Sequence, residues 1–447
     1  MERKKVLLVS LGCDKNLVDS EMMLGMLQEA GFTFTDAEEE ADAVVINTCC
    51  FIHDAKEESI QAILEMAALK TEGRLRALLV VGCLAQRYRE EILKEIPEVD
   101  CILGTTAIDK ITEALEKIFA GDCHNYIEDC NREPVYGRKR VVTTGGYYAY
   151  LKIAEGCSKH CTYCIIPKIR GDFRSIPMET LVEEATGLAN QGVKELILVA
   201  QETTMYGCDL YGEKRLPQLL HQLNEIPGLR WIRILYCYPE EITPELITAI
   251  RENEKVCHYL DIPIQHGSDR ILKRMGRRTD RAALEDIIGR LRREIPDICL
   301  RTTLITGFPG ETREEHEELL EFVDRMEFDR LGVFTYSPEE DTPAAEFPDQ
   351  IEEEVKKLRQ SQLMELQQEI AWEKAEGMIG RQLTVMIEGY LAKEQVYAAR
   401  SYKDAPGVDG YVFVNTDRSL MSGDFVTVTV TDSYEYDLIG EITDELA

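Results

Sequence analysis

Three cysteines in the segment EGCSKHCTYC have the spacing of an iron–sulfur ligand set. Cys157, Cys161 and Cys164 form the pattern CxxxCxxC. Three thiolates in one short loop can bind three irons of a 4Fe–4S cluster and leave the fourth iron for a non-protein ligand. A structural zinc site takes four ligands, and His160 inside the loop would compete with its cysteine neighbours. The pattern therefore favours a cluster over a zinc site or three packing residues.

A second set of cysteines follows three apolar runs near the start of the chain. Cys13, Cys49 and Cys83 come at or just after the ends of KVLLVSLG, ADAVVINT and ALLVVG. Sites in open parallel sheets form beyond the carboxyl ends of the strands, so these thiols are expected to meet at one edge. Cys50 is adjacent to Cys49, and neighbouring side chains of an extended segment point to opposite faces. Only one of the two can therefore face a shared cluster.

The elements that position these cysteines indicate an α/β chain in three parts. Residues 4–120 alternate apolar runs with helical patterns, which predicts a small open parallel α/β domain. Residues 121–145 are irregular and are expected to connect it to residues 146–376. There, six strand–helix units predict a partial (β/α)6 barrel, open on one side, with its chemistry at the carboxyl ends of the strands. Residues 377–447 change to period-two strands, which predict a small antiparallel barrel of the oligonucleotide-binding type.

The composition is that of a globular protein with acidic character. The chain has 447 residues, 44% of them hydrophobic, and a formal net charge of −31. Such a charge repels phosphate backbones and attracts basic partners. The run ALLVVGCLA is about half of a membrane span, and the N-terminal segment lacks a small-residue cleavage site, so a cytoplasmic protein without membrane contact is expected. Fourteen cysteines in that compartment favour metal or redox chemistry over disulfides.

The central region resembles the radical S-adenosylmethionine enzymes, because its CxxxCxxC loop follows the first strand of a six-unit barrel. The resemblance implies that the open iron binds the methionine moiety of S-adenosylmethionine. It also implies that an electron, supplied by an electron donor, releases a radical able to abstract hydrogen from an unactivated C–H bond. On the same grounds, Gln201, Glu202 and Arg233 at strand ends are expected to bind S-adenosylmethionine. Gly307 in TLITGFPGET is expected to allow close backbone approach to it.

The N-terminal segments SLGCDKNLVDSE, VINTCCFI and VVGCLAQRY resemble the first domain of the methylthiotransferases. This implies that Cys13, Cys49 and Cys83 hold an auxiliary 4Fe–4S cluster whose open iron can bind a sulfur species. Cys50 falls where relatives often carry a small residue and is expected to pack. The order of the regions also matches, with a C-terminal barrel of the TRAM type, so the resemblance covers nearly the whole chain.

Two features favour the branch of that family that modifies a ribosomal protein over the branch that modifies tRNA. GCDKNLVDSE and SYKDAPGVDG resemble the protein branch, whose substrate is an aspartate of small-subunit ribosomal protein S-twelve. In addition, residues 377–447 contain twelve acidic and five basic side chains, a formal net charge of −7. This suits a basic ribosomal protein better than RNA phosphates, so RNA contact is not expected to be the main binding mode.

The expected function is therefore methylthiolation of the β-carbon of that aspartate, with two 4Fe–4S clusters and S-adenosylmethionine. Sulfur would come from the cluster on Cys13, Cys49 and Cys83, and the methyl group from a second S-adenosylmethionine. The near alternative is a tRNA adenosine methylthiotransferase. A distant alternative is a non-catalytic iron–sulfur carrier, which would leave the barrel and its cysteine loop without a purpose.

Overall fold

The first sheet is built from short buried strands in parallel. The structure, a computed structural model, describes residues 4–443. The strand order is β2-β1-β3-β4-β5, and all pairings are parallel. This confirms the predicted open α/β unit, although β2 and β5 are too short to produce a visible apolar pattern. The strands are β1 (Lys5–Ser10), β2 (Thr33–Phe34), β3 (Ala43–Thr48), β4 (Ala77–Gly82) and β5 (Cys101–Leu103).

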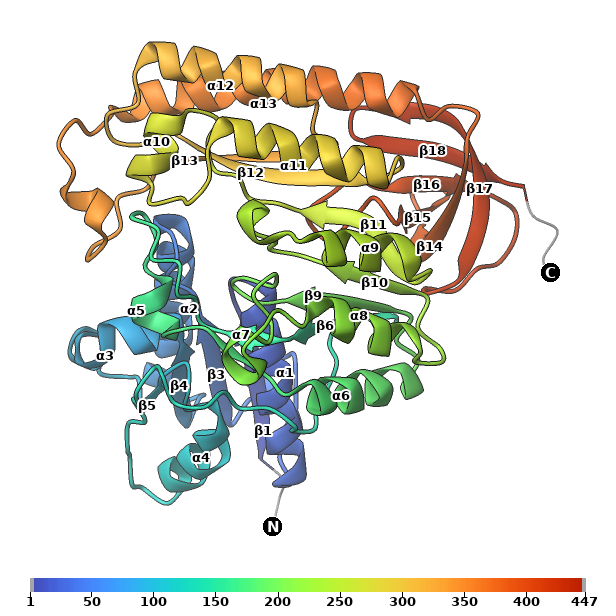
Figure 1. The fold of residues 1–447 in the computed structure, drawn as a ribbon. Helices are drawn as coiled ribbons and strands as arrows, with labels where there is room; N and C mark the ends of the chain where they lie inside the picture. Colours follow the sequence, from blue (N-terminus) through green and yellow to red (C-terminus); the bar gives the residue numbers. More distant parts are fainter. Residues whose placement is uncertain (1–3, 444–447) are drawn as a thin grey trace.

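Helices cover both faces of this sheet (Figure 1). α1 and α4 pack on one face and α2 and α3 on the other, each through an apolar cluster that alternate strand residues complete. Burial of both faces explains why β3 and β4 read as continuous apolar runs. The helices are α1 (Asp14–Glu29), α2 (His53–Thr71), α3 (Cys83–Glu95) and α4 (Ile111–Phe119).

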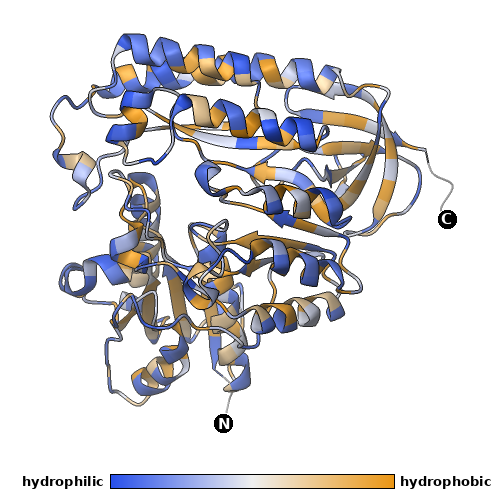
Figure 2. Ribbon diagram, in the orientation of Figure 1, coloured by the Kyte–Doolittle hydropathy of each residue, from blue (hydrophilic) through white to orange (hydrophobic). Residues whose placement is uncertain are grey.

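Six parallel strands form the second sheet, in the order β13-β12-β11-β10-β9-β6. No pairing between β6 and β13 closes it among residues 4–443, so the predicted partial barrel is confirmed. Its helices pack on the outer face, and Figure 2 shows apolar strands beneath helices with polar outer surfaces. The strands are β6 (Tyr148–Lys152), β9 (Glu195–Val199), β10 (Trp231–Ile234), β11 (Val256–Asp261), β12 (Cys299–Thr306) and β13 (Arg330–Thr335).

The helices between these strands complete the βα units, and a small hairpin follows β6. β7 (Ala154–Glu155) pairs with β8 (Arg174–Ser175) on either side of the cysteine loop. The helices are α5 (Ile166–Arg170), α6 (Met178–Asn190), α7 (Cys208–Tyr211), α8 (Leu216–Asn224), α9 (Pro244–Glu252), α10 (Asp269–Arg274), α11 (Arg281–Glu294), α12 (Arg313–Met326) and α13 (Glu353–Glu376).

Five strands close into a third unit, a small barrel in the order β14-β15-β16-β18-β17. All its pairings are antiparallel except β16 with β18. The predicted C-terminal barrel is confirmed. The domain boundaries near residues 120, 145 and 376 stay a prediction. The strands are β14 (Gln382–Leu391), β15 (Val396–Ser401), β16 (Val412–Asn415), β17 (Phe425–Tyr434) and β18 (Asp437–Ile442).

The C-terminal barrel fills the amino-terminal end of the central sheet's concave face. Met386 and Ala405 join an apolar cluster with inward-facing residues of β9, β10 and β11. Beside them, Glu195 at the start of β9 accepts hydrogen bonds from Arg233 at 2.8 Å and from Arg400 at 2.7 Å. All three side chains are almost completely buried. The central and C-terminal units therefore share one core.

The motif SYKDAPGVDG supplies much of this contact. Asp404 binds Arg330 at 2.6 Å, and Asp409 accepts a hydrogen bond from Tyr259 at 2.7 Å and lies 3.4 Å from Arg301. Part of the acidity of the C-terminal residues is thus neutralised inside the molecule. Across residues 4–443, no helix combines the length and the apolar character needed to cross a bilayer.

Replacing Glu195 with alanine should strongly destabilise the chain, because it leaves buried Arg233 without its carboxylate and removes one of the two carboxylates that bind Arg400. Breaking a buried pair in this way costs about 3–5 kcal/mol. Urea unfolding of the metal-free chain should therefore show a large fall in the midpoint. The matched control is Glu317→Ala, which removes the partner of exposed Arg313 and should leave the midpoint unchanged. Equal midpoints for the two variants would contradict a shared core.

Candidate functional site

The three N-terminal cysteines meet at one edge of the first sheet, as strand geometry predicts. Cys13 follows β1, Cys49 follows β3, and Cys83 begins α3 directly after β4. A side chain added at Gly12 would place its Cβ 2.5 Å from the Cβ of Cys49, so the turn before Cys13 touches Cys49. Asn16 links all three turns. Its amide donates to Leu11 and Thr48 carbonyls at 3.0 Å, and its Oδ1 lies 3.9 Å from the Cys83 sulfur.

Glycines in the left-handed region turn the chain just before three cysteines. Gly12, Gly82 and Gly156 have φ of 85°, 93° and 76°. Each turn is packed against other backbone or side-chain atoms, so a Cβ at any of the three would clash. Sequence reasoning missed this signal, which is a Gly-Cys pair at each of Cys13, Cys83 and Cys157. The pair is not sufficient by itself, because Gly207-Cys208 has the same form and opens the short helix α7.

The paired thiols lie in different surroundings. Cys49 is the residue that contacts the turn before Cys13, and its backbone N–H is held by the Ser59 hydroxyl at 3.0 Å. Cys50 is fully buried in the apolar cluster between the sheet and α2 and α3. Burial raises the pKa of the Cys50 thiol far above its ordinary value. The structure thus places Cys49 beside the turn before Cys13 and Cys50 in the apolar core.

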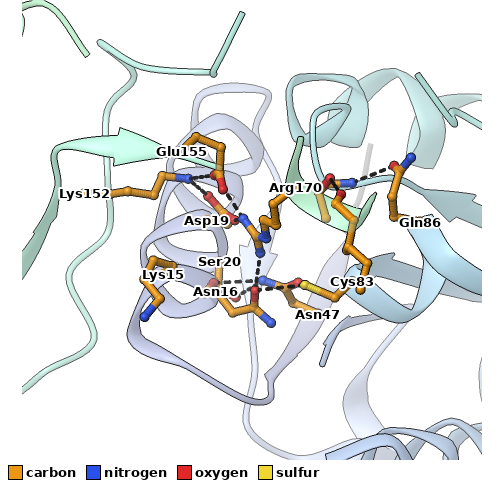
Figure 3. A network of polar contacts seen from close by, with 12 residues as sticks. Lys15, Asn16, Asp19, Ser20, Asn47, Cys83, Gln86, Lys152, Glu155 and Arg170 are labelled. Carbon is orange, nitrogen blue, oxygen red and sulfur yellow. Dashed lines mark hydrogen bonds and ion pairs between the residues drawn. The ribbon is translucent and has the colours of Figure 1, made fainter. Parts of the chain in front are cut away.

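A buried polar network joins this edge to the central sheet (Figure 3). Arg170, at the end of α5, donates to Asp19 and Glu155 at 3.0 Å and also to Asn16. Lys152 from β6 pairs with the same two carboxylates. All four charged side chains are at most 5% exposed, and their formal charges cancel. Arg170 and Lys152 outweigh the effect of burial and hold the pKa of the Glu155 carboxyl well below its usual value.

The second cysteine set occupies the loop between β7 and α5. The loop is held by hydrogen bonds from the Cys157 N–H to Gly171 at 3.0 Å and from the Thr162 N–H to Met275 at 2.9 Å. The Cys161 sulfur lies 3.5 Å from the Tyr238 hydroxyl oxygen. The loop therefore faces residues that follow β10, at the carboxyl end of the central sheet.

Gln201 and Glu202 lie beside this loop, as expected. Gln201 donates to Glu155 at 3.0 Å, and Glu202 Oε2 lies 3.7 Å from Lys159. Gln201 Oε1 and Glu202 Oε2 are buried and accept no hydrogen bond from the chain. Burial raises the pKa of the Glu202 carboxyl to about 7. Buried polar atoms normally have partners, so these two oxygens fit a site that takes a polar ligand.

Arg233 and Gly307 lie elsewhere than expected. Arg233 does not reach the cysteine loop, because its guanidinium binds Glu195 and the Tyr402 carbonyl at the contact with the C-terminal barrel. The open side of Gly307 is filled by Lys356 of α13, since a Cβ there would lie 2.4 Å from Lys356 Cγ. Arg233 is therefore bound at the contact with the C-terminal barrel, whereas the approach of S-adenosylmethionine to the Gly307 backbone stays a prediction.

Each cysteine set offers three thiols, the number that a 4Fe–4S cluster with one open iron takes. Within residues 4–443, no three His, Cys, Asp or Glu side chains come close enough to hold one ion. A cubane cluster instead takes each thiolate at a separate iron. Burial raises the pKa of Cys83 to about 12 and that of Cys157 to about 11. Metal binding must therefore drive the deprotonation of these thiols.

Comparisons with known proteins cover all three units. Residues 5–104 match the uncharacterized protein family UPF0004, residues 151–323 the radical SAM superfamily, and residues 379–443 the TRAM domain. The ribosomal protein uS12 methylthiotransferase RimO of Lachnoclostridium phytofermentans is 63% identical over 98% of this chain and 99% of its own. The protein of the same name from Clostridium botulinum is 48% identical over 100% of both chains.

Solved structures support the fold. The radical S-adenosylmethionine methyltransferase TsrM of Kitasatospora setae, with cobalamin and a [4Fe-4S] cluster bound, superimposes with a TM-score of 0.56. The alignment covers 85% of this chain and 79% of that one at 14% identity. The cobalamin-dependent radical enzyme OxsB gives a TM-score of 0.54 over 82% of this chain and 56% of its own, at 15% identity.

The barrel, its cysteine loop and the flanking domains define a radical SAM enzyme, a class that uses a 4Fe–4S cluster and S-adenosylmethionine. Within that class, the chain belongs to the family of the ribosomal protein uS12 methylthiotransferases. It is thus an enzyme that transfers sulfur-containing groups.

Substituting Gly12 with alanine should destabilise the metal-free chain by about 1–3 kcal/mol, because the new Cβ overlaps Cys49 and the residue keeps a positive φ. Chemical unfolding would measure the loss. The control is Gly187→Ala in α6, where a Cβ meets nothing within 4 Å and alanine should stabilise the helix by about 0.5–1 kcal/mol. A Gly12→Ala variant as stable as the wild type would contradict the close contact between the two turns.

Proposed function

We propose that this enzyme methylthiolates the β-carbon of an aspartate in small-subunit ribosomal protein uS12. The observation that supports this most is the link between the two cysteine sets. Gln201 beside the cysteine loop binds Glu155, Glu155 binds Arg170, and Arg170 binds Asn16 between the N-terminal cysteines. A reaction that joins carbon and sulfur needs such neighbouring sites, and the relatives named above are named as methylthiotransferases of ribosomal protein uS12.

The residues divide by the group that each would hold. Cys157, Cys161 and Cys164 would bind the cluster that works with S-adenosylmethionine, and Gln201 and Glu202 would bind S-adenosylmethionine itself. The auxiliary 4Fe–4S cluster would be held by Cys13, Cys49 and Cys83. When bound, these groups supply one-electron chemistry and the sulfur and methyl groups that are transferred.

The chain's own contribution is to position these groups and to exclude water. Arg170 fixes the Asn16 amide, which in turn holds the turns before Cys13 and Cys49. Glu155 fixes the Gln201 side chain so that its unpaired Oε1 is held in place. The network is buried in both domains that it joins. Neither the turns with the N-terminal cysteines nor the loop with Cys157 can therefore move without breaking a charged contact.

The partners follow from the surface and the chemistry. A basic ribosomal protein would be attracted by an acidic enzyme of net charge −31. An electron donor is needed for each turnover, and the proposed location is the cytoplasm, where ribosomal proteins are found. RNA contact would not be the main binding mode, because an acidic surface repels phosphates.

Two alternative functions predict different experimental results. A tRNA adenosine methylthiotransferase would share the clusters but modify a neutral base, which is not favoured by the family match at 63% identity. A non-catalytic iron–sulfur carrier would release no deoxyadenosine from S-adenosylmethionine under reducing conditions.

Cys157→Ala and Cys49→Ala should each lose one cluster and keep the other, because each removes one of three ligands from a separate set. Iron and sulfide analysis of anaerobically prepared protein should show about half of the wild-type content in each variant. The matched control is Cys50→Ala, which alters the neighbouring thiol in the apolar core and should keep full content. Retention of both clusters in Cys49→Ala would refute the auxiliary-site assignment.

Reduced wild-type enzyme should add the methylthio group to uS12 and leave tRNA unchanged. Mass spectrometry of both substrates after incubation with S-adenosylmethionine and a sulfide source would measure this. Modified adenosine together with unmodified uS12 would replace the proposed substrate by tRNA. The absence of deoxyadenosine would support a carrier instead.

A further inference from the structure

Lys15 is a buried cation in the motif GCDKNLVDSE, two residues after Cys13. The residue is 6% exposed, and its Nζ lies 2.9 Å from Asp14 Oδ1. The same ammonium stands 3.4 Å from the centre of the Tyr236 ring. Figure 3 shows that it is turned away from the Arg170 network, so this charge takes no part in joining the two domains there.

Contacts of Tyr236 place the ammonium between the two cysteine sets. The Tyr236 hydroxyl donates to Asp14 at 3.3 Å, next to Cys13. The Tyr236 carbonyl accepts a hydrogen bond at 3.1 Å from the N–H of Thr203, directly after Glu202. Tyr236 has a φ of 59°, and such strained residues persist where the surrounding structure enforces them, often at functional sites. Tyr236 thus links the residue after Cys13 to the residue after Glu202.

We propose that Lys15 binds the side-chain carboxylate of the target aspartate, an inference that rests on the proposed function. The β-carbon that would be modified is bonded directly to this carboxylate, so a cation that holds the carboxylate also positions the carbon. An ammonium has three N–H donors, and Asp14 takes one of them. Charge-assisted hydrogen bonds of this kind are stronger than neutral ones.

The charged neighbours are compatible with binding an anion. Asp14 accepts from the Lys15 ammonium, the Lys15 backbone N–H and the Tyr236 hydroxyl, so three donors share its charge. Asp261 binds Arg301 at 3.0 Å and the Tyr236 N–H at 3.1 Å. Both carboxylates are therefore already paired, and the Lys15 ammonium still has donors for another acceptor.

The same contacts connect the two segments that resemble the protein branch. Asp14 and Lys15 belong to the first, and Asp409 belongs to SYKDAPGVDG. Between them run contacts from Asp14 to Tyr236, from Tyr236 to Asp261, from Asp261 to Arg301 and from Arg301 to Asp409. An uncharged adenine would need no ammonium here, which gives Lys15 a role in substrate choice.

The test measures binding of purified uS12 to anaerobically reconstituted enzyme, with uS12 in two forms. One form carries the target aspartate and the other carries asparagine at that position. The wild-type enzyme should bind the aspartate form at least about tenfold more tightly, as expected for a hydrogen bond between charged groups. Lys15→Gln should bind both forms alike, and Lys15→Arg should keep the preference because it keeps the charge.

Lys94→Gln is the matched control, since it removes the same charge from the surface of the same domain, where Lys94 is 81% exposed; it should behave as the wild type. A preference that persists in Lys15→Gln, or that is absent in the wild type, would overturn the proposal. Even if Lys15→Gln fails to assemble, the absence of a preference in the wild type, or its loss in the charge-keeping variant Lys15→Arg, overturns the proposal. If the wild type does not methylthiolate uS12 at all, it is the proposed function that fails.

Discussion

The pairing of Arg170 and Lys152 with Asp19 and Glu155 is the interaction on which the arrangement of both cysteine sets depends. Four opposite charges out of contact with water are stable only while each keeps its partners. Asp19 comes from the first domain and the other three side chains come from the central one. The ion pairs between them therefore fix the distance between the two cysteine sets. Apolar packing alone would tolerate sliding, whereas directional hydrogen bonds do not.

The first sheet and the two ends of the central sheet use buried charges in different ways. At the edge of the first sheet, charges and the Asn16 amide hold loops that carry thiols. At the other end of the central sheet, Glu195 holds Arg233 and Arg400, and no candidate ligand is nearby. Buried ion pairs thus mark both ends of the central unit, and the end that carries the cysteine loop also holds the unpaired oxygens of Gln201 and Glu202.

Much of the fold and the cysteine placement could be predicted because long apolar runs and parallel pairing have clear local signals. Cys13, Cys49 and Cys83 could be brought together from the strand ends alone. The roles of Arg233 and Gly307 could not, because the direction of Arg233 depends on the C-terminal barrel and the space over Gly307 on Lys356. Arg170 was missed because its partner Asn16 is 154 positions away, beyond any local pattern.

The shared core between the central sheet and the C-terminal barrel has a consequence for how members of this family diverge. Met386 and Ala405 pack inside the sheet, and Asp409 reaches Arg301 within it. A C-terminal barrel from a relative with another substrate would bring side chains that do not match these pockets and charges. Recombination at this junction should therefore be rare, and the two units should change together.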